Sequence, residues 1–264
     1  MKKLSIITIC YNDPDLETTC KSIVEQSWQD FEWVVVDGAS NEETQKIWDK
    51  YKYRIDKFIS EPDKGIYNAQ NKGIKLASGK YLNFMNSGDS FYCKDTLKEV
   101  FENNEHNDEI LYGRANKINY GEEKSNYIDS LPKKINDLYF VFGSICSQAM
   151  FIQRDLFEKY GYYDESYKIA SDKDRWVIFQ KHGAKFHYLS NIICNYDCQG
   201  LSSTNKELLN KEFGNITNKY FTKEEIEKAN QPNYTFWEQI FSVKNTKDRK
   251  YKIFKIFGLS ICLK

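Results

Sequence analysis

Asp89 closes a stretch of nine residues in which an apolar segment gives way to a polar turn. The stretch runs from Tyr81 to Asp89 and reads YLNFMNSGD. In an open α/β sheet, polar groups just after the carboxyl end of a strand are where ligands bind. A carboxylate there can hold a hard divalent cation, and the cation can in turn hold a diphosphate. The other reading of the same residues is a strand followed by an ordinary Asx-type turn.

A second pair of carboxylates, Asp172 and Asp174, follows Ser171. Ser171 is a suitable N-cap for a predicted helix that continues to about His182. Carboxylates in the first turn of a helix interact favourably with its dipole. For either aspartate taken alone, this structural role is a sufficient explanation.

Strands and helices alternate in the first 90 residues. Short runs of β-branched and aromatic residues predict strands at 4–10, 31–36, 57–59 and from residue 81 onward. Apolar residues at helical spacing predict a helix after each of the first three strands, the second of them with a capping box of Ser40 and Glu43. This alternation predicts a parallel sheet with helices on both faces.

The later part of the chain is less regular, but it also mixes strands with helices. We expect a helix at 95–103, a strand pair within 109–118, a strand at 143–152, a short helix at 154–160, and strands at 185–189 and 192–196. The whole pattern predicts an α/β fold with a mixed, mainly parallel sheet.

Each predicted strand of the first part ends in, or is soon followed by, an acidic or amide side chain. Because the carboxyl ends of parallel strands share one edge of the sheet, we expect these side chains to converge. They belong to Asn12 and Asp13, Asp37, Asp63, and Asn86 with Asp89.

The known phosphate-binding loops are missing from this edge. No G-x-G-x-x-G follows the first strand, and Gly73 to Lys80 has the wrong spacing for a Walker A loop, with Tyr81 in place of Ser or Thr. Dinucleotide oxidoreductases and P-loop NTPases therefore fit poorly. If the ligand carries phosphate, its charge must be met differently, and a cation on Asp89 is the obvious candidate.

The composition indicates a globular protein in a reducing compartment. The chain has 264 residues, 41% hydrophobic and 29% charged, with a net charge of zero, which argues against a nucleic-acid partner. Its seven cysteines are scattered and odd in number, which is typical of a cytosolic protein rather than a disulfide framework. We expect neither a signal peptide nor a membrane-spanning helix.

After Thr204 the sequence becomes more strongly charged, and we expect a first domain at 1–203 and a helical extension at 204–264. Residues 244–264 contain seven Lys or Arg and one Asp, interspersed with aromatic and aliphatic residues. A basic, amphipathic tail of this kind can lie on an anionic membrane surface. The alternative is a terminal segment that docks on the domain.

Taken in order, five sequence blocks resemble family-2 glycosyltransferases with the GT-A fold, in particular bacterial enzymes of colanic acid, O-antigen and capsule synthesis. The resemblance covers roughly residues 4–202. The blocks are SIITICYN from Ser5, VVDGAS from Val35, SEPDKGIYNAQNKG from Ser60, GKYLNFMNSGD from Gly79, and YDE with ASDKD from Tyr163 and Ala170.

The resemblance implies roles for nine residues. The family's Asp-x-Asp metal motif aligns with Ser87-Gly88-Asp89, of which only the last carboxylate is present. The acidic pair that carries the family's catalytic base aligns with Ser171-Asp172, so that only the Asp remains. Related sequences often read His-Gln where this chain has Ser147-Gln148, and no role is assigned there. The implied sites are nucleotide binding by Thr8, Cys10, Tyr11, Asp37, Asp63, Gly65 and Asn71, a Mn²⁺ or Mg²⁺ ion at Asp89, and general base catalysis by Asp172.

These residues lead to the expectation of an inverting, metal-dependent glycosyltransferase in the cytoplasm. Its donor would be a nucleotide sugar, most simply UDP-linked, and its acceptor a saccharide on a lipid carrier at the inner membrane face. One alternative is a sugar nucleotidyltransferase, although the Gly-rich, Arg-containing loop of those enzymes is missing after the first strand. The other is a catalytically silent GT-A domain that binds nucleotide or partner enzymes, against which the retained Asp172 argues.

Overall fold

The computed structural model describes residues 2–120, 124–231, 241–245, 252–256 and 259–263. The contacts between them divide the chain into two compact units, Met1–Phe221 and Thr222–Lys264. Within the described ranges, no helix is both long and apolar enough to cross a membrane.

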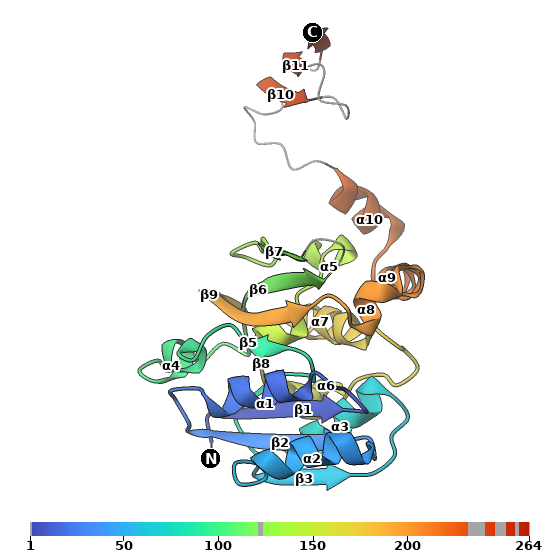
Figure 1. Ribbon diagram of the computed structural model, residues 1–264. Helices are drawn as coiled ribbons and strands as arrows, with labels where there is room; N and C mark the ends of the chain where they lie inside the picture. Colours follow the sequence, from blue (N-terminus) through green and yellow to red (C-terminus); the bar gives the residue numbers. More distant parts are fainter. Residues whose placement is uncertain (1, 121–123, 232–240, 246–251, 257–258, 264) are drawn as a thin grey trace. The chain divides into compact units, whose positions relative to one another are not determined.

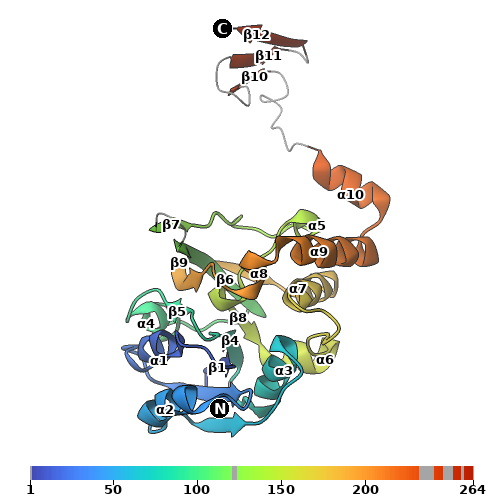
Figure 2. The same cartoon turned by 45° about the vertical axis from the view of Figure 1, so that its right-hand side comes forward.

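The first unit begins with the predicted alternation of strands and helices (Figure 1). The strands pair parallel in the order β3-β2-β1-β4. Right-handed crossovers give this order when β2 and β3 are added on one side of β1 and β4 is then added on its other side. Figure 2 shows α1 and α2 on one face of these strands and α3 on the other. The elements are β1 (Leu4–Cys10), α1 (Leu16–Val24), β2 (Phe31–Asp37), α2 (Glu42–Tyr51), β3 (Lys57–Ser60), α3 (Ile66–Leu76) and β4 (Tyr81–Phe84).

β1 lies at the centre of this part, between β2 and β4, and all of its residues are buried for that reason. Cys10 at its end pairs with Asp37 at the end of β2, so the two strands finish side by side. Trp33 of β2 and Trp48 of α2 pack edge to face, and the hydrophobic core that contains them continues into the rest of the unit. The sheet edge predicted for the polar side chains is thus formed by the ends of β1, β2 and β4.

The later part of the first unit extends the same sheet with antiparallel and parallel strands. β8 pairs antiparallel with both β4 and β6, and β9 pairs parallel with β6. The strand order therefore continues β4-β8-β6-β9-β5. β7 forms an antiparallel hairpin with β6, along the edge of β6 opposite β9. The elements are β5 (Ser90–Phe91), α4 (Thr96–Phe101), β6 (Ile110–Tyr120), β7 (Lys124–Ile128), α5 (Tyr139–Phe142), a 3-10 turn η1 (Ser147–Ala149), β8 (Met150–Gln153), α6 (Arg154–Tyr160), α7 (Ser171–Lys181) and β9 (Phe186–Asp197). The predicted mixed α/β fold is confirmed.

Several local predictions were wrong. Ser171 does not cap α7, because Ala170 holds the N-cap position and makes no side-chain cap hydrogen bond. Residues 110–120 form the single strand β6 and not a strand pair, since its hairpin partner β7 begins at Lys124. Residues 143–152 form the turn η1 and a short β8, not one strand, because Ala149 bonds back to Cys146. Helix α2 is capped by Asn41, whose side chain accepts from the Thr44 N–H, while Ser40 instead accepts from the Asn12 N–H. The two strands predicted within 185–196 are one strand, β9, whose irregular register opposite β6 interrupted the sequence pattern.

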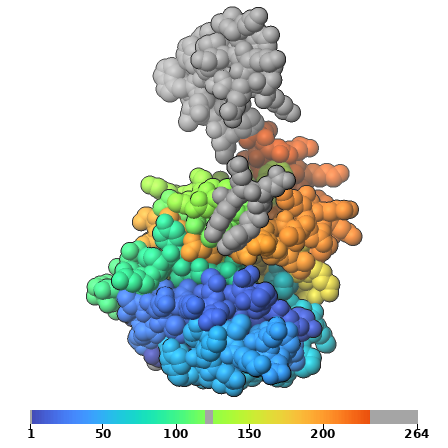
Figure 3. All heavy atoms as spheres, viewed as in Figure 1, coloured from blue at the N-terminus to red at the C-terminus, as the bar shows by residue number. Residues whose placement is uncertain are grey.

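Helices α8 (Leu201–Thr204) and α9 (Lys206–Tyr220) complete the first unit. The sequence placed the start of the extension at residue 204, whereas the compact unit continues to Phe221. In Figure 3 its N-terminal residues are blue and its later residues green to orange.

The second unit contains α10 (Lys223–Asn230), which Thr222 and Glu225 cap reciprocally, and an antiparallel sheet of three strands. These strands are β10 (Phe241–Asn245), β11 (Lys252–Ile256) and β12 (Leu259–Leu263). The predicted helices of the extension are present in α9 and α10, but the described backbone of the basic tail is extended. The amphipathic character predicted for residues 244–264 concerns side chains outside the described set.

Candidate functional site

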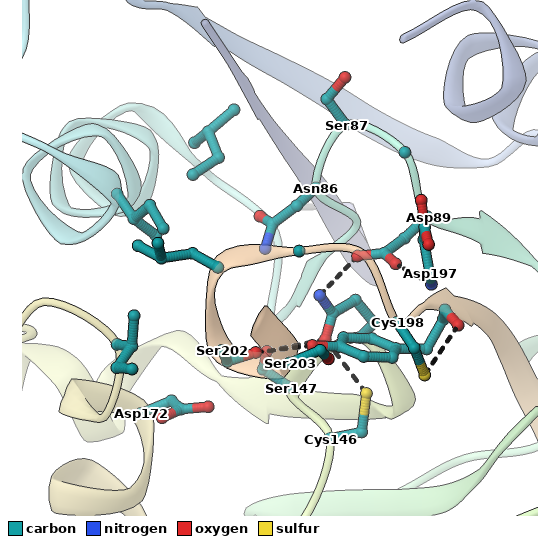
Figure 4. Close-up of a pocket in the computed structure, with 18 of the residues that line it drawn as sticks. Asn86, Ser87, Asp89, Cys146, Ser147, Asp172, Asp197, Cys198, Ser202 and Ser203 are labelled. Atoms are coloured by element: carbon teal, nitrogen blue, oxygen red, sulfur yellow. Dashed lines mark hydrogen bonds between the residues drawn. The ribbon is translucent and has the colours of Figure 1, made fainter. Parts of the chain in front are cut away.

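A cavity of about 920 Å³ lies in the first unit at the predicted sheet edge. One wall consists of residues after β1, at the start of α3 and in the turn after β4. The opposite wall comes from β6, β7, η1, the start of α7, and the segment that leads from β9 into α9. In Figure 4, Asp89 and Asp172 project into this space from opposite sides.

Carboxylates make up most of the charged side chains in the described part of the lining. It includes one lysine and neither arginine nor histidine, so an anionic ligand needs a cation of its own or a position beside that lysine. The charged side chains are Asp13, Asp15, Asp63, Asp89, Asp129, Asp172, Asp197 and Lys117.

Six of the nine predicted residues line the cavity: Cys10, Tyr11, Asp63, Gly65, Asp89 and Asp172. Convergence of the strand ends brings together the residues that end or follow β1, β3 and β4, and the start of α7 adds Asp172. The remaining three, Thr8, Asp37 and Asn71, are buried outside the lining.

Tyr11 and Asp63 come close together over Gly38, because that residue has no side chain. A Cβ atom on Gly38 would lie 2.7 Å from Asp63 Oδ2 and 3.2 Å from Tyr11 Cδ2. Tyr11 is 67% exposed, so its ring is free to pack on a ligand. Gly65 takes a φ of +120°, which favours glycine, and its N–H donates to Asp63 Oδ1 at 2.7 Å. These residues form a narrow place at which a planar group could stack.

Both carboxylate oxygens of Asp37 accept hydrogen bonds within the protein. Its Oδ1 accepts from Trp48 Nε1 at 3.2 Å. Its Oδ2 accepts from Ser60 Oγ, Gln45 Nε2 and the Ser40 N–H at 2.6, 2.8 and 3.0 Å. Burial acts to raise the pKa of Asp37, but these hydrogen bonds outweigh it and hold the pKa below its ordinary value. The carboxylate therefore ties the turn after β2 to the end of β3.

Thr8 and Asn71 also make contacts within the fold. Thr8 Oγ1 accepts from Trp33 Nε1 at 3.0 Å, in the core beneath the sheet. Asn71 donates to the Tyr163 carbonyl and accepts from the Tyr163 N–H, both at 2.9 Å. It thereby fixes α3 against the segment that precedes α7.

Asp89 follows β4 and is held by two hydrogen bonds in the wall of the cavity. Gln148 Nε2 donates to Oδ2 at 2.6 Å, and the Asp197 N–H donates to Oδ1 at 2.9 Å. Burial, and next the charge of Cys146, raise the pKa of Asp89 well above its ordinary value despite these bonds. A cation beside the carboxylate would offset that cost.

The donor set suits a cation that arrives together with its ligand. Among the described residues, no group of three or more His, Cys, Asp or Glu side chains could hold a metal ion. Mg²⁺ commonly binds one or two protein carboxylates and fills its remaining positions with substrate phosphates and water. Asp89, a buried and incompletely compensated oxygen donor, fits that pattern.

Gln148 and Asp197 are site residues that sequence reasoning missed. Gln148 was left without a role because its neighbour departs from the family's pattern. Asp197 is the last residue of β9. The rule that polar groups at strand ends bind ligands could have identified it if the strand predicted at 192–196 had been extended by one residue.

Asp172 and Asp174 lie in different surroundings although both belong to the first turn of α7. Asp172 lines the cavity, and burial raises its pKa to about 6. Asp174 is fully buried away from the cavity, where Arg175, Lys219 and Tyr220 all donate to it. Only Asp172 is available to a ligand.

Tyr67 connects the two walls near Asp172. It lies in the first turn of α3, lines the cavity and is 6% exposed. Burial, and next the charge of Asp172, raise the pKa of its hydroxyl, which also lies against the backbone amides of Asp172 and Ser171. The start of α7 is therefore held in place by the start of α3.

Comparison with known proteins agrees with this geometry. The sequence model described as Glycosyl transferase family 2 matches residues 5–161. The chain is 32% identical to a PGL/p-HBAD biosynthesis glycosyltransferase of Mycobacterium bovis over 203 residues, which cover 73% of this chain and 74% of that one.

Two solved structures show the same fold. One is S. aureus TarS (residues 1–349) in complex with UDP-GlcNAc, with a TM-score of 0.60, 21% identity, and coverage of 74% of this chain and 58% of that one. The other is the mannosyltransferase PcManGT of Pyrobaculum calidifontis with GDP-Man and Mn²⁺, with a TM-score of 0.57, 16% identity, and coverage of 74% and 56%. The chain thus spans less than two thirds of either solved chain. The predicted GT-A fold is confirmed.

Proposed function

We propose that the chain, which belongs to glycosyl transferase family 2, transfers a sugar from a UDP-linked donor with inversion. Its membership in the family makes it a glycosyltransferase that uses a nucleotide sugar. The acceptor is a saccharide on a lipid carrier, and the product is part of a bacterial surface polysaccharide. The observation that carries the proposal is the placement of Asp89 and Asp172 on opposite walls of one cavity, with Asp174 directed away.

The wall formed by Tyr11, Asp63 and Gly65 is assigned to the nucleotide. Tyr11 offers an exposed ring for the base, and Asp63 Oδ2, beside Gly38, offers an acceptor for a base or ribose donor. UDP is preferred because TarS, a structural neighbour, binds UDP-GlcNAc. Thr8, Asp37 and Asn71, for which the resemblance also implied nucleotide binding, lie buried behind this wall and hold its turns in place.

The charge of the cavity supports the use of Mn²⁺ or Mg²⁺. A diphosphate brings negative charge into a lining whose charged side chains, among the residues that the structure describes, are seven aspartates and one lysine. Asp89, oriented by Gln148, and the diphosphate would hold the ion, which when bound stabilises the charge that develops on the leaving group. PcManGT, another neighbour, contains Mn²⁺.

Asp172 is assigned as the base that takes the proton from the acceptor hydroxyl. A pKa of about 6 leaves it mostly ionised at neutral pH and still basic enough to accept a proton in the transition state. The hydroxyl oxygen attacks the anomeric carbon of the donor as the bond to the diphosphate breaks. One displacement from the side opposite the leaving group inverts that carbon.

The reaction is placed at the inner face of the cell membrane. Residues 244–264 carry a net charge of +6, from seven basic residues and one acidic residue, and are assigned to anionic lipid headgroups. A lipid-linked acceptor would be presented at the same surface.

Donor screening tests the proposal most directly. The protein is incubated with a panel of UDP-, GDP-, CDP- and dTDP-sugars, with Mn²⁺ or EDTA, and its thermal unfolding is recorded. We expect the largest rise in melting temperature with one UDP-sugar, and only with the ion. Stabilisation by nucleoside triphosphates together with sugar 1-phosphates would favour a nucleotidyltransferase. If a UDP-sugar binds but is not transferred to any saccharide of the organism's own surface glycans, the catalytically silent GT-A domain would be favoured.

A further inference from the structure

Lys117 is flanked by two tyrosines in one row of the sheet. On β6 it pairs with Tyr127 of β7 on one side and with Tyr196 of β9 on the other. Residues paired across neighbouring strands present their side chains to the same face of the sheet. All three line the cavity, so the row forms part of its wall.

The ammonium group of Lys117 lies over an aromatic ring and makes no direct ion pair among the described residues. Burial acts to lower the pKa of Lys117, but negative charge nearby, first at Cys146, outweighs it and raises the pKa. Its Nζ lies 3.7 Å from the centre of the Tyr196 ring, and the Tyr196 hydroxyl is fixed by Ser202 Oγ at 2.8 Å. Among the described residues it makes no hydrogen bond and no ion pair, and even Asp129 lies beyond ion-pair distance. Lys117 is therefore a positioned cation whose hydrogen-bonding capacity is unused.

We propose that Tyr127, Lys117 and Tyr196 form an acceptor subsite for an acidic sugar, one that carries a carboxylate or a phosphate. This inference rests on the proposed function and narrows its acceptor. Tyrosine faces pack against the apolar face of a sugar ring, while the ammonium group pairs with the anion. Tyr127, at 57% exposure, provides the rim at which a longer saccharide enters.

The electrostatics of the cavity favour this position. The other charged side chains of the described lining are aspartates, which repel an anionic acceptor everywhere except beside Lys117. The row also lies on β6, β7 and β9, which provide none of the residues assigned to the nucleotide. Asp89 and Asp172 line the same cavity as Lys117, so a sugar bound at the row would share the space of the proposed catalytic centre.

The test compares acidic and neutral sugars on metal-free protein, with EDTA present. Methyl β-glucuronide, glucose 6-phosphate and methyl β-glucoside are titrated by ligand-observed NMR into wild type, Lys117→Met and Lys159→Met. Lys159 is the matched control, because it also lies over a tyrosine, Tyr160 at 4.9 Å, but outside the cavity. We expect wild type and Lys159→Met to prefer at least one acidic sugar roughly 10- to 100-fold, and Lys117→Met to lose that preference. The tighter of the two acidic sugars identifies the anion as carboxylate or phosphate.

Equal binding of acidic and neutral sugars to wild type, or a preference that survives in Lys117→Met, would overturn the proposal. Tyr127→Ala provides an independent variant at an exposed position, and it should weaken all three sugars alike. Unchanged sugar binding in Tyr127→Ala would also count against the subsite.

Calorimetry with UDP and Mn²⁺ separates this proposal from the proposed function. If wild type binds no UDP, the function fails whatever the sugars do. If Lys117→Met binds UDP within a factor of about three of wild type while its acid preference is lost, the subsite is supported. If UDP affinity falls as far as sugar affinity, Lys117 serves the nucleotide and the subsite is rejected.

Discussion

Gln148 donates a 2.6 Å hydrogen bond to Asp89, the carboxylate assigned to the metal ion. Groups that orient a metal ligand typically contribute 10- to 100-fold to metal affinity. We therefore expect Gln148→Ala to weaken Mn²⁺-dependent UDP binding by roughly that factor, as measured by calorimetry. Gln45→Ala is the matched control, because Gln45 makes the same kind of bond to Asp37 outside the cavity. Equal effects of the two changes would contradict an orienting role for Gln148.

UDP binding should depend on a divalent cation through Asp89. Wild type and Asp89→Ala are compared by calorimetry, each with Mn²⁺ and with EDTA. In wild type, EDTA should abolish most of the affinity, because the acidic lining then meets the diphosphate uncompensated. In Asp89→Ala, affinity should be low in both conditions. The same diphosphate affinity in all four experiments would remove the metal ion from the proposal.

Asp172→Asn should lose turnover by about 10²- to 10⁴-fold, while UDP affinity stays within a factor of a few. Asparagine keeps the shape and can accept the Lys173 N–H bond, but it is not a base. Asp174→Asn should instead lower stability by about 3–5 kcal/mol, because it leaves the buried charge of Arg175 without its partner. Transfer rates, UDP binding and thermal unfolding are measured for both variants. Normal turnover in Asp172→Asn would reject it as the base.

The raised pKa of Asp172 predicts opposite effects of pH on activity and stability. Activity should fall with acid below a pKa of about 6, as the base becomes protonated. Stability changes the other way: the carboxyl group of the unfolded chain ionises near pH 4, so rising pH between about 4 and 6 favours unfolding. The raised pKa lowers the free energy of unfolding by at most about 3 kcal/mol, and this full loss of stability is reached above pH 6.

Asp172→Asn should therefore melt several degrees higher than wild type at pH 7 and at about the same temperature at pH 4. Thermal unfolding at both pH values, with each protein free of nucleotide, measures the difference. A constant difference across pH would show that Asp172 is ionised at no energetic cost.

The C-terminal residues should bind anionic membranes. Each basic residue near such a surface contributes about 1 kcal/mol, so full-length protein should sediment with phosphatidylglycerol vesicles at low salt. A chain that ends at Gln231 keeps the first unit and α10 but lacks the basic segment, and it should stay in the supernatant. If full-length protein ignores the vesicles, the segment has another purpose.

The sequence predicted those parts of the site that depend on local order. Cys10, Tyr11, Asp63, Gly65 and Asp89 could be placed because strands in a parallel sheet end at one edge. Asp172 could be placed because the helix start and the family pattern coincide. The alternation of strands and helices gave the first half of the sheet with almost correct bounds.

The rest depended on contacts that no local pattern carries. Asp37 looks like a ligand-binding carboxylate, but Trp48 and Ser60, 11 and 23 residues away, both donate hydrogen bonds to it. Lys117 lies in the interior of β6, where the alternation of side chains along a strand predicts only which face of the sheet it occupies. Its exposure to the cavity follows from pairing with β9, which lies about 80 residues further along the chain.

The acidic lining has a consequence for inhibitor chemistry. Under the proposed function, mimics of nucleotide sugars that retain the diphosphate would enter the cavity together with a metal ion. A uridine joined through a neutral linker to an iminosugar would reverse that dependence, because its protonated ring nitrogen is attracted by the aspartates around it. Such a compound should bind better to this cavity when the metal is absent, since the ion and the ammonium group would compete for the same carboxylates.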